Sequence, residues 1–152
     1  MSFFSSSDFP KIQKPVSIAI VRSDFNEDIV EELFQDALHG FKKCGVPMES
    51  IEEFRVPGAL EIPQVVSRLK RSDEFDGILT LGVVIKGDTP HFEYVCENVT
   101  RGIMDISLMS NVPIIFGVLT VLNTQQAEIR ISKGREFASS LIKMMMLFEG
   151  KM

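Results

Sequence analysis

A run of apolar residues that ends in a glycine and a proline constrains the fold of this 152-residue chain more than any other feature. Residues 78–85 (ILTLGVVI) form an apolar, partly β-branched run, as in a strand that is covered on both faces. Gly87 permits a tight turn and a close approach of the backbone to a ligand. Pro90 suits the first position of a helix, with Thr89 as its N-cap. The segment therefore predicts a buried strand that turns directly into a helix.

The helix start predicted at Thr89 and Pro90 is also a candidate anion site. The unpaired N–H groups of a helix start bind anions, phosphate above all. His91 would lie in the first turn, where a histidine beside a phosphate can carry protons. Such junctions are common in α/β folds, and a first-turn histidine is often a surface residue. This segment alone therefore leaves catalysis open.

Strands and helices alternate along the rest of the chain. Apolar runs predict further strands at 16–21, 51–56 and 113–119. A first helix is predicted between Asn26, a candidate cap, and Gly45. Further helices are predicted at about 60–71, 89–109, 124–131 and 134–148. Such alternation is typical of parallel βαβ units with right-handed crossovers. We expect an α/β fold of three layers (α/β/α), flavodoxin-like, with helices on both faces of a four-stranded parallel sheet. One domain would span 16–152, after an irregular N-terminal arm at 1–15.

The acidic charge balance limits the partners of the chain. Sixteen Lys and Arg residues against 21 Asp and Glu residues give a formal net charge of −5. Without a basic run, this charge argues against nucleic acid or an anionic membrane surface as the main partner. No segment approaches transmembrane length, and the start does not resemble a secretory signal.

The two cysteines, Cys44 and Cys96, lie in apolar helical patterns without the spacing of a metal site. We interpret both as buried free thiols of a protein in a reducing compartment. A cytoplasmic location and the absence of a metal site are the corresponding expectations.

Four loops should meet at one edge of the predicted sheet, because ligands of such folds bind outside the carboxyl ends of the strands. The loops are 24–26, 57–61, 87–91 and the residues after Leu119. Phe25 can stack on a flat ring or staple the following helix. Glu61 can accept hydrogen bonds from a polyol or balance a helix dipole. Arg130 can offer a planar fork to a phosphate or be a solvated surface charge.

Four segments of the chain form a specific set: 24–26 (DFN), 55–63 (RVPGALEIP), 81–96 (LGVVIKGDTPHFEYVC) and 112–120 (VPIIFGVLT). Together they resemble the family of 6,7-dimethyl-8-ribityllumazine synthase, the penultimate enzyme of riboflavin biosynthesis, and the match extends from about residue 16 to residue 148. The resemblance implies a transferase without a cofactor. It would condense 5-amino-6-(D-ribitylamino)uracil with 3,4-dihydroxy-2-butanone 4-phosphate: the amine attacks the ketone, phosphate leaves, and the ring closes to the lumazine.

The resemblance also implies a role for individual residues. His91 would be the proton shuttle, and the site would lie between subunits of a homopentamer. Substrate-binding residues would be Phe25 on the pyrimidine ring, Asn26, the ribityl-binding residues Ala59, Leu60 and Glu61, the backbone of Val84 and Ile85, the partner's Phe116, and Lys133; phosphate-binding residues would be Gly87, Asp88, Thr89 and, from the partner, Arg130.

The sequence leaves alternatives open for the assembly and for the activity. Family members usually have a longer connection than residues 131–134, and this region influences whether pentamers build an icosahedral shell. The sequence therefore predicts a pentamer and leaves the shell open, with riboflavin synthase as a candidate partner. Alternative functions are a non-catalytic flavin- or lumazine-binding or shell protein, a related riboflavin synthase, and an FMN carrier. Thr89 and His91 argue against the riboflavin synthase. An FMN carrier would have a hydroxyl-rich phosphate loop after the first strand, and only Ser23 and Asp24 are found there.

Overall fold

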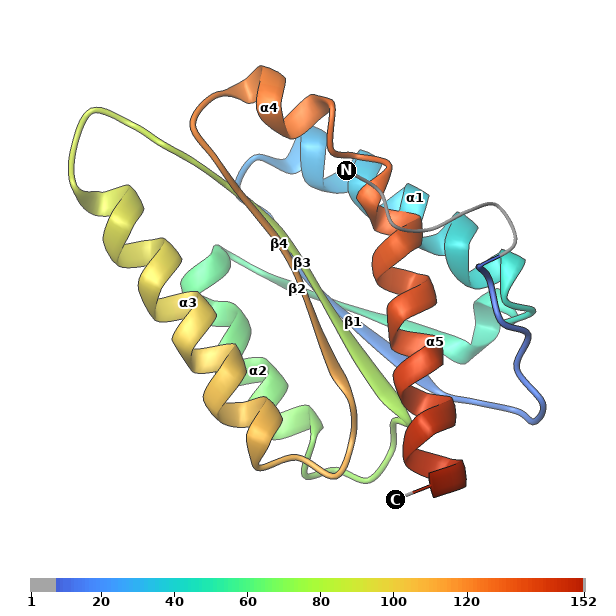
Figure 1. Ribbon diagram of the computed structural model, residues 1–152. Coiled ribbons are helices and arrows are strands. Elements are labelled where there is room, and N and C mark those ends of the chain that lie inside the picture. Colours follow the sequence, from blue (N-terminus) through green and yellow to red (C-terminus); the bar gives the residue numbers. More distant parts are fainter. Residues whose placement is uncertain (1–7, 152) are drawn as a thin grey trace.

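A four-stranded parallel sheet forms the middle layer of the protein. The computed structural model describes residues 8–151 (Figure 1). The strands have the order β2-β1-β3-β4, and all three neighbouring pairs are parallel. Their bounds are Ile18–Ser23 for β1, Ile51–Val56 for β2, Gly77–Ile85 for β3 and Ile114–Val121 for β4.

Helices cover both faces of this sheet. Figure 1 shows α1 (Glu27–Lys43) and α5 (Lys133–Lys151) on one face, and α2 (Ile62–Leu69) and α3 (His91–Leu108) on the other. Short helical segments complete the chain: η1 (Met48–Ser50), η2 (Ala59–Glu61) and α4 (Thr124–Glu128). The predicted flavodoxin-like arrangement of three layers is thus confirmed.

Alternation along the central strand β1 explains why two cores form. Ile18 and Ile20 belong to the hydrophobic cluster beneath α1 and α5, whereas Ala19 and Val21 belong to the cluster beneath α2 and α3. Successive side chains of a strand point to opposite faces, so residues 18–21 of β1, which are covered on both sides, are all apolar. No helix among residues 8–151 is long and apolar enough to cross a membrane.

Most elements differ from their predicted bounds by a few residues. Strand β1 begins at Ile18 rather than at residue 16, because its register pairs Ile18 with Ile51 at the start of β2. Strand β4 continues to Val121, which pairs with Ile85 at the end of β3. Helix α2 is shorter than predicted, because residues 59–61 form the 3-10 turn η2 in front of it.

The region after β4 departs most from the prediction. Helix α4 ends at Glu128, so Arg130 lies in the turn that follows the helix and not in the helix itself. Helix α5 begins at Lys133, one residue earlier than predicted, and continues to residue 151. Lys133 therefore belongs to a helix start and not to a connecting loop.

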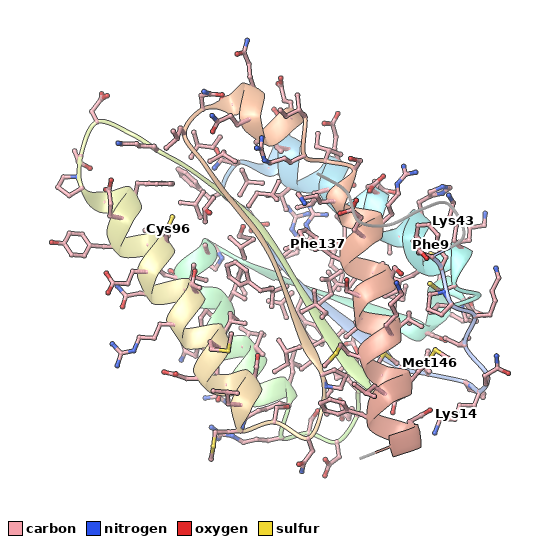
Figure 2. The ribbon with its side chains drawn as sticks, in the orientation of Figure 1. Phe9, Lys14, Lys43, Cys96, Phe137 and Met146 are labelled. Atoms are coloured by element: carbon pink, nitrogen blue, oxygen red, sulfur yellow. The ribbon has the colours of Figure 1, made fainter. Side chains whose placement is uncertain are left out.

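The irregular arm runs along α1 and α5. Residues 8–15 contain no helix or strand, while residues 1–7 of the predicted arm lie outside the described part of the chain. The Lys43 ammonium lies 4.9 Å from the Phe9 ring centroid, and Lys14 forms an ion pair with Glu149 of α5 (Figure 2). The described part of the arm, residues 8–15, is thus tied to α1 and α5.

The two cysteines are both free, but only Cys44 is buried. Cys96 on α3 is half-buried, so the prediction of two buried thiols is wrong for this residue. Burial raises the pKa of the Cys44 thiol to about 11.

Candidate active site

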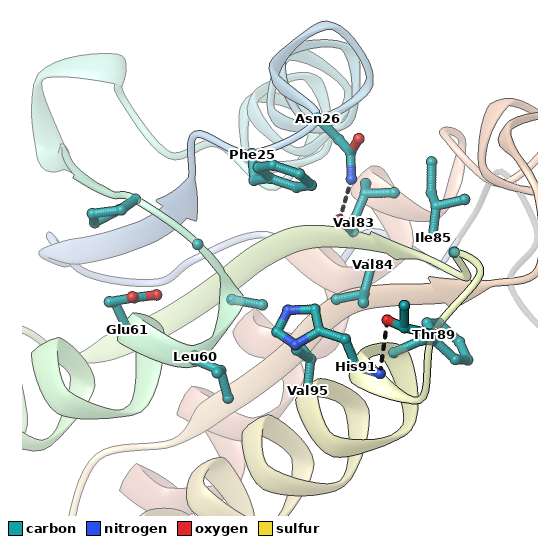
Figure 3. A pocket seen from close by; sticks show the side chains of 15 residues that line it. Phe25, Asn26, Leu60, Glu61, Val83, Val84, Ile85, Thr89, His91 and Val95 are labelled. Carbon is teal, nitrogen blue, oxygen red and sulfur yellow. Dashed lines mark hydrogen bonds between the residues drawn. The ribbon is translucent and has the colours of Figure 1, made fainter.

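A pocket of about 510 Å³ opens at the carboxyl ends of β1, β2 and β3 (Figure 3). This is the edge at which the sequence predicted that loops would meet. The wall consists of Phe25, Asn26, residues 57–61, residues 83–85, Gly87, Thr89, His91, Phe92 and Val95. The fold therefore brings three of the four predicted loops to one cavity.

Phe25 and Asn26 enter the pocket from the turn between β1 and α1. Phe25 lines the pocket while its side chain stays 72 % exposed. Asn26 has a left-handed backbone (φ 61°), which asparagine tolerates better than most residues. It occupies the N-cap position of α1, but its side chain makes no cap hydrogen bond; its amide nitrogen donates instead to the Val83 carbonyl oxygen at 2.8 Å. The prediction is therefore confirmed for the cap position of Asn26 but not for a side-chain cap, since its amide joins the turn to β3.

The segment after β2 supplies a carboxylate. Pro57 and Gly58 end the strand, and residues 59–61 form a 3-10 turn whose Glu61 N–H donates to the Gly58 carbonyl oxygen at 3.2 Å. Glu61 precedes α2 without making a side-chain cap hydrogen bond, and it lines the pocket. Its carboxylate is thus free to accept from a ligand. Leu60 presents an apolar side chain, 46 % exposed, beside it.

The turn between β3 and α3 forms the opposite wall. Helix α3 begins at His91 with Pro90 in the cap position, one residue later than predicted. Thr89 still serves this helix start, because its hydroxyl oxygen accepts from the His91 N–H at 3.4 Å. A Cβ atom built at Gly87 would have nothing within 4 Å, so the space in front of this turn is open. A helix start facing open space is a site for an anion.

His91 is the only histidine of the pocket wall, and Figure 3 shows its imidazole pointing into the cavity. The wall also contains one carboxylate, that of Glu61, and none of its residues is a lysine or an arginine. Lys86, next to the turn, lies 4.0 Å from the Glu93 carboxylate instead. An anion bound here would therefore find N–H groups and an imidazole in this chain, but no fixed cation in the wall.

Four residues predicted for the site lie outside the pocket wall. Asp88 belongs to the turn but does not line the cavity. Phe116 lies on β4 opposite Thr80 and packs against the core beneath α2 and α3. The Arg130 guanidinium donates to the Gln126 carbonyl oxygen at 2.9 Å, and the Lys133 ammonium lies 3.7 Å from the Glu136 carboxylate. Within one chain, these side chains do not meet the cavity.

Apolar residues of the wall were not predicted as site residues. Val83 is a strand residue, while Phe92 and Val95 lie on the first turns of α3. The sequence carried a signal for Val95 only as a member of an apolar helical face. Among the described residues, no group of three or more His, Cys, Asp or Glu side chains could hold a metal ion.

One family of known proteins matches most of this chain. The family model of 6,7-dimethyl-8-ribityllumazine synthase matches residues 15–149. The chain is similar to three bacterial proteins that carry this name. In Leuconostoc mesenteroides the identity is 45 % over 137 residues, covering 87 % of this chain and 88 % of the relative. The relative from Limosilactobacillus reuteri is 43 % identical, and the match covers 86 % of this chain and 88 % of the relative. The relative from Parabacteroides distasonis is 42 % identical, with 85 % of this chain and 84 % of the relative covered.

Proposed function

The chain belongs to the 6,7-dimethyl-8-ribityllumazine synthase family, and we propose that the pocket at the carboxyl ends of β1, β2 and β3 is its active site. The protein is an enzyme of riboflavin biosynthesis, a transferase. It condenses 5-amino-6-(D-ribitylamino)uracil with 3,4-dihydroxy-2-butanone 4-phosphate to the lumazine and releases phosphate and water. One observation carries the assignment of the pocket: a single cavity combines an aromatic ring, a carboxylate, a helix start and a histidine.

The pyrimidine substrate would occupy the side of the pocket formed by the turns after β1 and β2. Its flat ring stacks on Phe25, whose exposed face is available for it. The backbone of Val84 and Ile85 at the end of β3 reads the edge of the ring, with Asn26 beside it. Ribityl hydroxyls donate to Glu61.

The ribityl chain is held along the 3-10 turn as well as by the carboxylate. Ala59 and Leu60 line the pocket next to Glu61 and offer backbone and apolar surface to a flexible polyol. This placement is supported by the free Glu61 carboxylate, which makes no cap hydrogen bond of its own.

The butanone phosphate would occupy the opposite side. Its phosphate binds in the turn of Gly87, Asp88 and Thr89 at the start of α3. His91 then lies where it can pass protons during imine formation and phosphate departure. Much of the rate enhancement comes from holding two reactants in one orientation. The amine attacks the ketone carbon, and a first water leaves as the imine forms. After the phosphate departs, the ribitylamino nitrogen closes the ring on the remaining carbonyl carbon, and loss of a second water gives the lumazine.

A phosphate dianion in this pocket calls for a cation that its own wall does not provide. We therefore infer that a neighbouring subunit of a homopentamer contributes Arg130, together with Phe116 and Lys133. Arg130 lies in a turn, and its side chain makes one described hydrogen bond, to the Gln126 carbonyl oxygen, so the other N–H groups of its guanidinium can face a partner. In an assembly with sites between subunits, Phe116, Arg130 and Lys133, which lie outside the cavity of their own chain, would line the cavity of a neighbour.

Two further proposals concern the location and the partner of the enzyme. We place it in the cytoplasm, because both cysteines are free. Riboflavin synthase is the candidate partner, since it would consume the product. Native mass spectrometry distinguishes a pentamer from an icosahedral shell by the mass of the assembly. No observation favours the non-catalytic binding or shell protein as the alternative function.

Turnover tests the assignment. Purified protein with both substrates and no added cofactor should form the lumazine faster than the spontaneous reaction, and Arg130→Ala should reduce this rate. Arg68→Ala is the matched control, because Arg68 is an exposed arginine near the far end of α2. No rate above background would contradict the proposed function.

Mixed assemblies test whether the site is shared. Subunits with Phe25→Ala and subunits with Arg130→Ala are each unfolded, mixed and reassembled. Sites between subunits predict that the mixture regains activity, because some interfaces combine an intact Phe25 with an intact Arg130. Sites within one chain predict no gain over the two parent variants.

A further inference from the structure

Arg55 lies outside the pocket wall, yet it contacts both sides of the turn that carries Phe25. We propose that Arg55 is a positioning residue, whose guanidinium holds the Phe25 ring where it receives the pyrimidine substrate. The inference rests on the proposed function, because it assigns Arg55 a task in the same site.

The contacts of Arg55 enclose the turn. From β2, its Nε donates to Asp24 Oδ1 at 2.7 Å, and its Nη2 donates to Glu27 Oε1 at 2.6 Å. Asp24 directly precedes Phe25, and Glu27 is the first residue of α1, two positions after it. A planar guanidinium with several donors can satisfy two carboxylates at once, whereas a lysine ammonium acts as a point charge.

Backbone and amide hydrogen bonds hold the same turn from other directions. The Asp24 N–H donates to the Val56 carbonyl oxygen at 2.7 Å, and the Phe25 N–H donates to the Pro57 carbonyl oxygen at 3.1 Å. These bonds continue the pairing of β1 and β2 beyond the strand ends. The Asn26 amide joins the turn to β3. The side chain of Arg55 thus holds Asp24 and Glu27, and backbone hydrogen bonds hold Asp24 and Phe25.

The Phe25 ring itself has little packing that could orient it. At 72 % exposure, it contributes almost nothing to either core. Within one chain, the direction of the ring comes from the backbone of the turn, and the Arg55 clamp restrains that backbone. If the ring is already ordered in the free protein, less binding free energy is lost in ordering it when the ligand binds.

The clamp is a local device and not a support of the whole fold. The side chains of Arg55, Asp24 and Glu27 are 42 %, 48 % and 59 % exposed, and ion pairs with such exposure contribute little to global stability. Hydrogen bonds to Glu27 and Asp24 raise the pKa of Arg55 above its already high value. Arg55 therefore stays charged. Because the three side chains are exposed, loss of the clamp should affect ring binding far more than folding.

Binding of the product lumazine tests the inference without turnover. Arg55→Met should raise the Kd measured by isothermal titration about two- to tenfold, the effect of one side chain that must be ordered on binding. The KM for the pyrimidine should rise in parallel, and the KM for the butanone phosphate should stay unchanged. Asp24→Asn combined with Glu27→Gln should reproduce the effect with Arg55 intact, and Arg55→Lys should be intermediate. Arg68→Met, on α2, is the control that should leave Kd unchanged.

A double-mutant cycle with Phe25→Ala separates positioning from a general structural role. If Arg55 acts through the ring, Arg55→Met adds no further loss of lumazine binding once Phe25 is alanine. An equal effect of Arg55→Met in both backgrounds overturns the inference, as does an unchanged Kd in both clamp variants. If Phe25→Ala alone leaves lumazine binding unchanged, the ring site of the proposed function is wrong, and the inference falls with it.

Discussion

Replacement of Phe25 by alanine separates binding from stability more cleanly than any other change at the pocket. The side chain is 72 % exposed, so its removal takes almost no apolar area from the core. We expect the free energy of unfolding to change by about 0.5 kcal/mol or less. Stacking of an aromatic side chain on a base-like ring is worth roughly 1–3 kcal/mol. At about 1.4 kcal/mol for each factor of ten, Phe25→Ala should raise the Kd of the lumazine roughly 5- to 140-fold.

The assay is isothermal titration of the product lumazine into the assembled protein, with unfolding in urea measured on the same preparation. Phe25→Tyr keeps an aromatic face and should retain most of the affinity, whereas Phe25→Leu keeps an apolar side chain and should lose it. An unchanged Kd in Phe25→Ala would refute the stacking role. Equal losses of affinity and stability would refute the argument that the ring lies outside the core.

Further predictions concern the histidine, the helix packing and the cysteines. His91→Ala should slow turnover by about a hundredfold or less, since orientation of the reactants survives; near-complete inactivity with intact lumazine binding would count against this view. Gly134→Ala should cost about 1–3 kcal/mol in urea unfolding, because its Cβ would lie 2.5 Å from the Leu33 carbonyl oxygen and force α5 away from α1. An unchanged midpoint would contradict that packing. With its pKa raised to about 11, Cys44 should resist a thiol reagent at pH 8, where about one thiol in a thousand is ionised. Half-buried Cys96 should react first, and equal rates would contradict the assignment.

The sequence predicted the sheet well because local and global signals agree there. Strand β2 has the predicted bounds, 51–56, because its β-branched and aromatic residues end at Pro57 and Gly58. The long apolar run of β3 likewise shows a strand buried on both faces. Such elements carry their boundary signals in their own residues.

Helix ends were less predictable, because some glycines serve distant contacts. Gly134 was interpreted as the boundary of the last helix, but it lies inside α5, where the Leu33 carbonyl of α1 approaches it closely. Asn26 was interpreted as a cap, and its amide instead bonds to β3. Both roles depend on which element packs nearby, and a local pattern does not contain that information.

The sequence predicted where the candidate site lies better than it predicted which residues form the wall of the pocket. The rule for parallel sheets brought Phe25, Glu61 and His91 to one cavity, as the structure has them, although their roles stay predictions. Phe116 and Arg130 lie outside this cavity within one chain. Their roles therefore depend on a second subunit, and sequence patterns do not show how two copies meet.

A crystal structure of the assembled protein with the product lumazine and inorganic phosphate would show whether this pocket is the active site. We expect the lumazine ring on Phe25, ribityl hydroxyls at Glu61, and phosphate at the turn of 87–89 near His91 and the Arg130 of a neighbouring subunit. Lumazine bound elsewhere, or a phosphate without any contact to the start of α3, would contradict the assignment of this pocket as the active site.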